Sequence, residues 1–383
     1  MNPWLRRLAL VVTFAALAYL TWRAVLSPPE YHVDTDVYRD GARAWLDGRP
    51  LYGDAVFPTQ TPDGPLPFTY PPLAAIVFTP LTWVSLPTAS AALTVTTMVL
   101  LVVCLAITLP GRWALCAGFA AVALWLKFEP LWATLAYGQI NVVLMTLVLA
   151  DCVPRRPWWP RGMAVGLAMA VKLTPAVFLL YFVLRRQYRA AATAVITFLT
   201  ATGVAAVLAP ADSWEYWTKS VRQTGRIGYI ALSTNQNITG ALARLAVPST
   251  TATVIWVIAS VAMLALAVWA ARRALEASEP VLALMCVALF GLVVSPVSWS
   301  HHWVWLLPAV ASAAAVGYRR RSVPLMAVAL IGLLLVASPA VLALFDERSE
   351  ALFSYLGLPY VLFAIAYCFA VRSSRVPDKL AGS

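Results

Sequence analysis

The sequence predicts an all-α integral membrane protein that crosses the bilayer many times. Hydrophobic residues make up 61% of the 383 residues and charged residues only 12%, which leaves too little polar surface to cover a soluble globule of this size. Apolar runs long enough to cross a hydrocarbon core of roughly 30 Å recur along nearly the whole chain. Because no segment is left for a large soluble domain, we expect one integral membrane domain over residues 1–383.

The charges follow the pattern of a membrane topology. The formal net charge of +11 could indicate nucleic-acid binding, but Lys and Arg lie in short clusters at every second connection between apolar runs. This positive-inside pattern places those connections in the cytoplasm and the acid-rich connections outside. We therefore expect a multi-pass protein of the plasma membrane that contacts membrane lipids and no nucleic acid. The basic clusters are Arg6/Arg7, Arg112, Arg155/Arg156/Arg161, Arg185/Arg186/Arg189, Arg272/Arg273, Arg319/Arg320/Arg321 and Arg372/Arg375/Lys379.

About twelve membrane-embedded segments follow from this pattern, with both termini in the cytoplasm. The first segment resembles a signal peptide, but no small-residue cleavage site stands out, so we expect an uncleaved helix. Two large connections, 27–71 and 210–250, lie outside. The expected segments are 5–26, 88–109, 114–128, 138–153, 162–173, 175–185, 190–209, 251–271, 280–296, 303–317, 323–344 and 358–371.

Lys172 lies where two of these segments meet. Segments 162–173 and 175–185 are too short to cross the bilayer alone and join at Lys172-Leu173-Thr174-Pro175. Lipid permits such a break only where the freed backbone groups are buried in protein or line a cavity. A lysine in apolar surroundings usually faces such a cavity, although it can also extend to the membrane interface. We favour a cavity in which Lys172 binds a phosphate.

Two carboxylates follow the first segment. Asp34 and Asp36 alternate with Val33, Thr35 and Val37, so in an extended conformation both carboxylates would share one face. A carboxylate at the membrane surface can act as general base on a substrate hydroxyl. The other interpretation is an ordinary solvated loop.

A proline-rich stretch ends the same outer connection. Four prolines in the eight residues from Pro65 to Pro72 stiffen the backbone and prevent a continuous helix. This stretch is equally compatible with a rigid linker and with a substrate contact, and Tyr70 can serve both roles.

Further polar side chains gather at predicted outer ends of segments. The histidines His301 and His302 lie in the break from Ser295 to Trp303. Adjacent histidines do not point together on a helix, and no zinc-binding spacing is present, so we prefer hydrogen bonds to phosphate or sugar over a metal site. Amide side chains suit sugar hydroxyls, and the candidates are Gln139, Asn141, Asn235 and Gln236.

These motifs together resemble one family, the actinobacterial polyprenyl-phosphate-mannose-dependent α-mannosyltransferases of the phosphatidylinositol-mannoside and lipoglycan type, within the GT-C superfamily. The resemblance covers most of the chain. It is carried by Val33 to Tyr38 with Gly41, Leu51-Tyr52, Thr61 to Pro72, Gly138 to Asn141, Lys172 to Pro175, Asn235 to Asn237 and Ser295 to Trp303.

The resemblance implies a GT-C-like fold, a polyprenyl-phosphate sugar donor, a glycolipid acceptor and a catalytic aspartate in the first outer loop. That aspartate corresponds to Asp34, because Asp36 matches the family pattern less well. Lys172 and His301 or His302 would correspond to the groups around the donor phosphate. A monophosphate donor needs cations and hydrogen bonds at the leaving phosphate, so we expect no cofactor and no obligatory metal.

Two alternatives remain open at this point. A lipid or sugar transporter also has broken helices and charges at depth, but it would show inverted repeats, which are not evident. The same fold could also use a different polyprenyl-phosphate sugar, and the linkage could be α-1,2 or α-1,6.

The topology can be tested with reporter fusions. Fusions after Arg156, Arg273 and Arg321 should report a cytoplasmic position, and fusions near Asp54 and Asp212 an outer position, because the basic connections stay inside. Alkaline phosphatase and green fluorescent protein activities measure the two sides. An outer signal at Arg321 would overturn the assignment.

Overall fold

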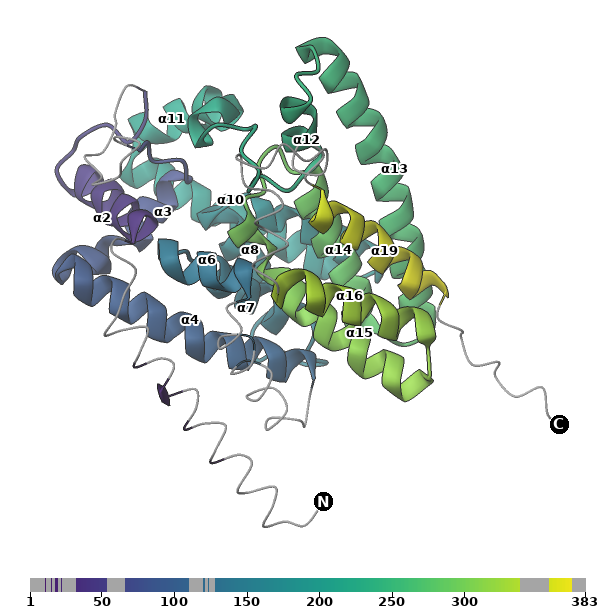
Figure 1. Cartoon of the computed structure of the whole chain (residues 1–383). Helices are drawn as coiled ribbons and strands as arrows, with labels where there is room; N and C mark the ends of the chain where they lie inside the picture. The colour runs from purple at the N-terminus through teal and green to yellow at the C-terminus, as the bar shows by residue number, and fades with distance from the viewer. Residues whose placement is uncertain are drawn as a thin grey trace. The chain divides into compact units, whose positions relative to one another are not determined.

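A computed structural model describes residues 11, 15, 18, 19, 22, 32–53, 66–109, 120, 123, 128–337 and 358–373. The elements in these residues are helices, as the sequence predicts (Figure 1). The chain divides into two compact units, one of residues 1–176 and 188–229 and one of residues 177–187 and 230–383. The single domain expected from the sequence stays a prediction.

The first unit carries the first outer connection and the long helices α4 and α10. Its 3-10 turns are η1 (Thr79–Trp83), η3 (Ser220–Arg222) and η4 (Thr224–Ile227), and η2 (Thr174–Val177) leads out of it. Its α-helices are α2 (Val33–Leu46), α3 (Pro72–Val77), α4 (Leu86–Thr108), α6 (Glu129–Tyr137), α7 (Asn141–Cys152), α8 (Met163–Val171), α10 (Tyr188–Leu208) and α11 (Pro210–Thr218).

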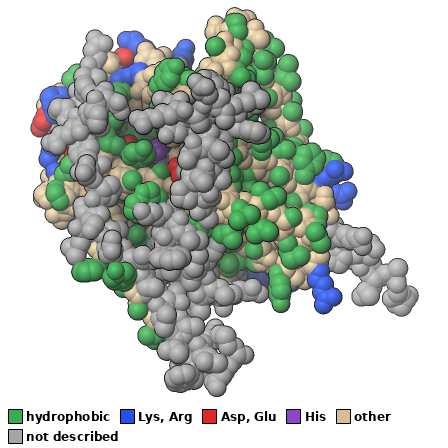
Figure 2. All heavy atoms as spheres, in the orientation of Figure 1, with side chains coloured by type: hydrophobic (Ala, Val, Ile, Leu, Met, Phe, Trp, Pro, Cys, Tyr) green, Lys and Arg blue, Asp and Glu red, His purple; other side chains and the backbone are tan. Residues whose placement is uncertain are grey.

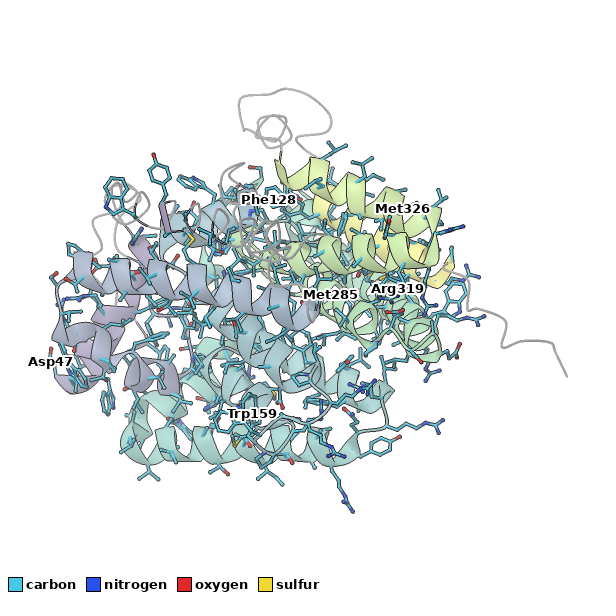
Figure 3. The ribbon with its side chains drawn as sticks, turned by 90° about the horizontal axis from the view of Figure 1, so that it is seen from below. Asp47, Phe128, Trp159, Met285, Arg319 and Met326 are labelled. Atoms are coloured by element: carbon cyan, nitrogen blue, oxygen red, sulfur yellow. The ribbon has the colours of Figure 1, made fainter. Side chains whose placement is uncertain are left out.

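The second unit is built around the long helix α13. Glu279, just before α14, pairs with Arg319 and Arg320 at the end of α15, and Figure 3 labels Arg319 there. Figure 2 shows hydrophobic side chains over much of this unit, with Lys and Arg gathered toward an edge. Its elements are α9 (Phe178–Leu184), α12 (Ile238–Arg244), α13 (Ser249–Glu276), α14 (Pro280–Val294), η5 (Ser300–Trp305), α15 (Leu306–Arg320), α16 (Val323–Ala337) and α19 (Pro359–Ser373).

Several predicted segments coincide with helices, but the count of about twelve stays a prediction. Within the described residues, α4, α10 and α13 are long and apolar enough to cross a membrane alone, and α6 with α7 adds a fourth span if the bent pair counts as one. The predicted segments 5–26 and 114–128 fall almost entirely outside the described residues, as do residues 338–344 of the segment 323–344. The break after α8 lies where the sequence predicts it, and Lys172 is the residue at which this helix ends.

The expectation that Asp34 and Asp36 share one face of an extended segment is wrong. Both residues lie in the first turn of α2, where acidic side chains interact favourably with the helix dipole. In a helix, side chains two positions apart point in different directions, because the period is 3.6 residues. Asp34 therefore shares a face with Tyr38, which the alternating sequence pattern does not indicate.

A left-handed glycine separates α6 from α7. Gly138 has φ 70° and ψ 41°, and the two helices meet there at 118°. A Cβ atom at this position would lie 2.0 Å from the Thr35 hydroxyl oxygen, so the turn fits against α2 only with glycine. The sequence predicts one segment from 138 and misses α6, because the apolar pattern alone does not reveal a sharp turn.

An aromatic core fixes α2 against the proline-rich stretch. The Tyr38 ring stacks on Phe78 with centroids 4.4 Å apart and meets Tyr70 edge-on at 5.3 Å. Such pairs contribute about 0.5–1.5 kcal/mol each beyond their burial. The buried guanidinium of Arg39 donates to the Leu81 carbonyl at 2.6 Å and so connects α2 with η1.

A buried carboxylate closes the opposite end of α7. Asp151 accepts hydrogen bonds from the backbone N–H groups of Gly162 at 2.9 Å and Val165 at 3.0 Å, which are donors that the start of α8 cannot satisfy itself. Arg161 donates to the Asp151 carbonyl at 2.8 Å. This acid lies within the predicted segment 138–153, near its expected cytoplasmic end, and its charge is stabilised by helix N–H groups.

Substitution of Gly138 by alanine should destabilise the protein more than the same change at Gly48. Both glycines have positive φ, so each alanine costs about 1–2 kcal/mol of backbone strain. At Gly48 nothing lies within 4 Å of the added Cβ, whereas at Gly138 the Cβ also meets Thr35. Melting temperatures of the purified variants in detergent measure the difference. An equal decrease in melting temperature for both variants would show that the contact with Thr35 has no effect on stability.

Candidate active site

Asp34 lies in a polar cluster within the first unit. Burial raises the pKa of its carboxyl to about 6, against the lowering effects of a hydrogen bond with Gln139 and the positive charge of Lys172. The side chain is partly buried, in the first turn of α2. A carboxylate with this pKa is ionised at neutral pH and still basic enough to accept a proton.

Gln139 connects this carboxylate to two buried tyrosines. Its amide oxygen accepts from the Tyr38 hydroxyl at 3.0 Å and from the Tyr70 hydroxyl at 3.3 Å. With the oxygen so occupied, the amide nitrogen is the donor to Asp34. Burial raises the pKa of both phenols above the usual range, so they remain neutral donors.

Lys172 joins the cluster from the end of α8. Its ammonium donates to the Tyr70 hydroxyl at 3.4 Å and to the Asn141 amide oxygen at 3.3 Å. It also lies 5.1 Å from the centre of the Tyr70 ring. The structure thus brings together Asp34, Tyr70, Gln139, Asn141 and Lys172 from four separate places in the sequence.

Asp36 lies in the same turn of α2 as Asp34 but on another face of the helix. Its charge acts to raise the pKa of Arg39 and of Asp40. The helical conformation of α2 explains the separation, because Asp36 points away from the face of Asp34 and Tyr38.

Tyr38 belongs to the cluster although sequence reasoning gave it no role. The signal was available, because Asp34 and Tyr38 are four residues apart and lie on one face once the segment is read as a helix. Thr35, which donates to the Gly138 carbonyl at 3.3 Å, is a second residue that was missed.

The remaining predicted residues lie in the second unit. The backbone N–H of Gln236 donates to the Ser298 carbonyl at 2.9 Å, and the Asn235 amide oxygen accepts from the Ser298 N–H at 2.9 Å. This pairing joins the Asn235-Gln236 segment to the one that carries the two histidines. His301 is buried and meets His302 edge-on, with ring centroids 4.6 Å apart.

The amide of Asn235 is committed to the backbone, since its nitrogen also donates to the Ile230 carbonyl at 2.9 Å. Gln236 differs, because its amide oxygen has no partner among the described residues, and the same holds for the Ser298 hydroxyl and the Trp303 indole N–H. Buried polar atoms of this kind favour a ligand-binding role for Gln236 over Asn235.

The described residues contain no group of three or more His, Cys, Asp or Glu side chains arranged to hold a metal ion. The polar groups of both units are hydrogen-bond donors, acceptors and single charges. Such groups suit a substrate with hydroxyls and a phosphate.

Comparison with known proteins now identifies the class. Residues 68–296 match glycosyltransferase family 87, more than half of the chain. The chain belongs to this family. Two curated relatives are named polyprenol-phosphate-mannose-dependent alpha-(1-2)-phosphatidylinositol mannoside mannosyltransferase. The relative from Mycobacterium tuberculosis is 50% identical over 92% of this chain and 86% of its own length. The one from Mycolicibacterium smegmatis is 51% identical over 95% and 89%.

A third relative, from M. tuberculosis, is named for a phosphatidylinositol pentamannoside acceptor and is 41% identical over 79% of this chain and 71% of its own length. No solved structure matches the chain. Membership of glycosyltransferase family 87 confirms the predicted enzyme class, and the relatives confirm the resemblance to mannosyltransferases. Together with the apolar helices, the family supports a membrane protein. The family 87 match begins after Asp34 and ends before His301.

Proposed function

We propose that this membrane glycosyltransferase moves mannose from a polyprenyl-phosphate-mannose donor onto a phosphatidylinositol mannoside, at the extracytoplasmic face of the plasma membrane. The relatives named for this reaction support the donor, the acceptor and an α-(1-2) linkage. The single observation that carries the mechanism is the Asp34 carboxylate, held by Gln139 and with its pKa raised to about 6.

In the proposed step an acceptor hydroxyl attacks the anomeric carbon of mannose from the face opposite the phosphate. Asp34 takes the hydroxyl proton as the new carbon–oxygen bond forms. The bond between the anomeric carbon and the phosphate oxygen breaks, and its electron pair leaves with the polyprenyl phosphate. The configuration at the anomeric carbon is inverted.

The leaving phosphate gains negative charge in this step and needs positive groups beside it. Lys172 is our candidate in the first unit, with Tyr70 and Asn141 fixing its ammonium. His301 and His302 are the alternative candidates in the second unit, whereas the amide oxygen of Gln236 is an acceptor and suits a sugar hydroxyl. Asn235 supports that segment through its backbone hydrogen bonds.

Asp34→Asn should be nearly inactive although still expressed and inserted. The substitution keeps the size of the side chain and removes the proton acceptor, and general base catalysis is worth about 10² to 10⁴ in rate. Transfer of label from radioactive polyprenyl-phosphate mannose to lipid measures the loss. In the wild type, kcat/KM should rise with pH up to about 6 and then level off, because the protonated carboxyl cannot act as base.

Asp36→Asn is the matched control, since it removes an equal charge from the same turn of α2 but from another face of the helix. It should keep most of the activity. If Asp36→Asn abolished transfer while Asp34→Asn retained it, the assignment of the base would be wrong.

Lys172→Ala should lower transfer strongly and raise the KM for the donor. It should also move the acidic limb of the pH profile to higher pH, because the charge of Lys172 lowers the pKa of Asp34. Lys172→Arg keeps the charge and should leave the limb near its wild-type position. Near-normal activity of Lys172→Ala with an unmoved limb would show that this lysine only extends to the membrane interface. The same assay on His301→Ala and His302→Ala separates the two histidines.

A further inference from the structure

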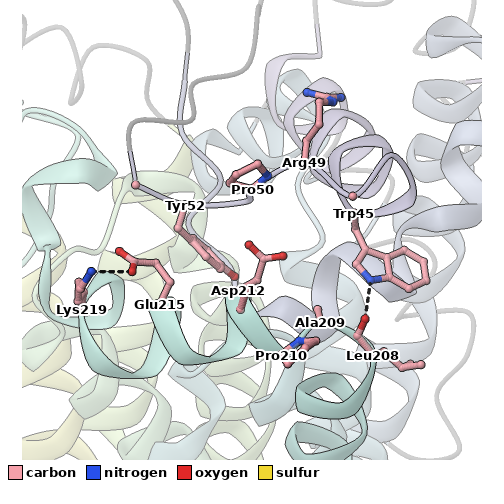
Figure 4. Close-up of a pocket in the computed structure, with 13 residues that line it drawn as sticks. Trp45, Arg49, Pro50, Tyr52, Leu208, Ala209, Pro210, Asp212, Glu215 and Lys219 are labelled. Carbon is pink, nitrogen blue, oxygen red and sulfur yellow. Dashed lines mark hydrogen bonds and ion pairs between the residues drawn. The ribbon is translucent and has the colours of Figure 1, made fainter.

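A second cavity lies at the far end of α2, within the first unit. It measures about 600 Å³ and is formed by the end of α2, the stretch that follows it, and the junction of α10 with α11 (Figure 4). This volume is within the range of about 300–1,000 Å³ that is typical of ligand sites. At 1.5 Å per residue, Trp45 lies about 16 Å along the axis of α2 from Asp34. The cavity is therefore separate from the reacting groups.

Polar side chains of both signs line this cavity. Asp212 and Glu215 point into it from one face of α11, and Arg49 and Lys219 contribute two positive charges (Figure 4). One oxygen of Asp212 accepts from the Leu51 N–H at 2.9 Å, which fixes the carboxylate. Glu215 pairs with Lys219 at 2.9 Å. Arg49 pairs with Asp47 at 3.2 Å, so both positive charges already have carboxylate partners, which argues against a phosphate as the ligand. The described residues hold no group of three or more side chains arranged for a metal ion, and a neutral ligand rich in hydroxyls therefore fits best.

Aromatic rings complete the lining. Trp45 is oriented by a hydrogen bond from its indole N–H to the Leu208 carbonyl at 3.5 Å, and Tyr52 is held by its hydroxyl at 2.6 Å from the Tyr70 carbonyl. Carboxylates and a guanidinium can hydrogen-bond the hydroxyls of a sugar, and the half-buried ring of Trp45 can cover its apolar face.

The position of the cavity fits a sugar that is attached to a lipid. Its wall includes Leu208, the last residue of α10, which is an apolar helix long enough to cross a membrane. The cavity thus lies where this helix ends. The following helix α11 also carries the exposed Trp214, and tryptophan is enriched at membrane interfaces. A glycolipid headgroup lies at this level of the bilayer.

We propose that this cavity binds a sugar ring of the glycolipid acceptor that is remote from the hydroxyl that reacts. The inference rests on the proposed function, in which the acceptor carries several sugar rings. The remote ring places the acceptor along α2, so that the reacting hydroxyl reaches Asp34.

Kinetics with two acceptors test this inference. The purified protein in detergent is assayed with phosphatidylinositol mannoside and with a short alkyl mannoside that has a single sugar. Glu215→Gln and Arg49→Gln should each raise the KM for phosphatidylinositol mannoside, relative to the KM for the alkyl mannoside, about threefold to tenfold, as expected for one lost hydrogen bond. Glu276→Gln is the matched control, because it breaks the exposed Arg273–Glu276 ion pair at the end of α13. It should leave this ratio unchanged.

An unchanged ratio in both cavity variants would overturn the inference while leaving the proposed function intact. If the wild type transferred mannose to neither acceptor, the proposed function would fail instead. Binding of phosphatidylinositol mannoside, measured by saturation-transfer NMR, would then test the inference independently of the transfer reaction. Equal binding by the wild type and Glu215→Gln would overturn it, and weaker binding by the variant would support it.

Discussion

The side-chain amide of Gln139 joins the Asp34 carboxylate to the hydroxyls of Tyr38 and Tyr70, and the geometry of the first unit depends on this connection. An amide has one acceptor end and one donor end, so two phenols on the oxygen leave the nitrogen for the carboxylate. The Gln139 amide can reach both the phenols and the carboxylate only because the chain turns sharply at Gly138, the residue before it. The same turn places Gly138 against Thr35, on α2 next to Asp34.

Burial and charge have opposite effects on the pKa of the Asp34 carboxyl, and their balance determines at which pH it is ionised. A carboxyl taken out of water resists ionisation, whereas the Gln139 hydrogen bond and the Lys172 charge favour the ionised form. Neither tyrosine releases a proton to compete with it, because burial raises the pKa of both phenols. Asp34 is thus the acid of this cluster that is ionised at neutral pH and still basic enough for the general-base role we propose.

Much of the cluster around Asp34 could be predicted from the sequence, and the reason differs from one residue to the next. Asp34, Lys172 and Gln139 stand out because polar groups in an apolar chain are costly and rarely accidental. The helix at α2 could not be predicted from the alternation of Asp34 and Asp36 with apolar residues, since two acids near a helix start give the same local pattern as a strand. The turn at Gly138 depends on a contact with Thr35, more than a hundred positions away, which no local pattern contains.

The second unit illustrates a different limit of sequence reasoning. Asn235 and Gln236 are chemically alike and adjacent, and the sequence offers no reason to separate them. Their environments do, because the Asn235 amide is engaged with the backbone at both ends and the Gln236 oxygen has no partner within the described part of the chain. A buried acceptor without a donor is costly unless a ligand supplies one. Asn235 is therefore the residue that holds the segment together, and Gln236 is the one that we propose as a substrate contact.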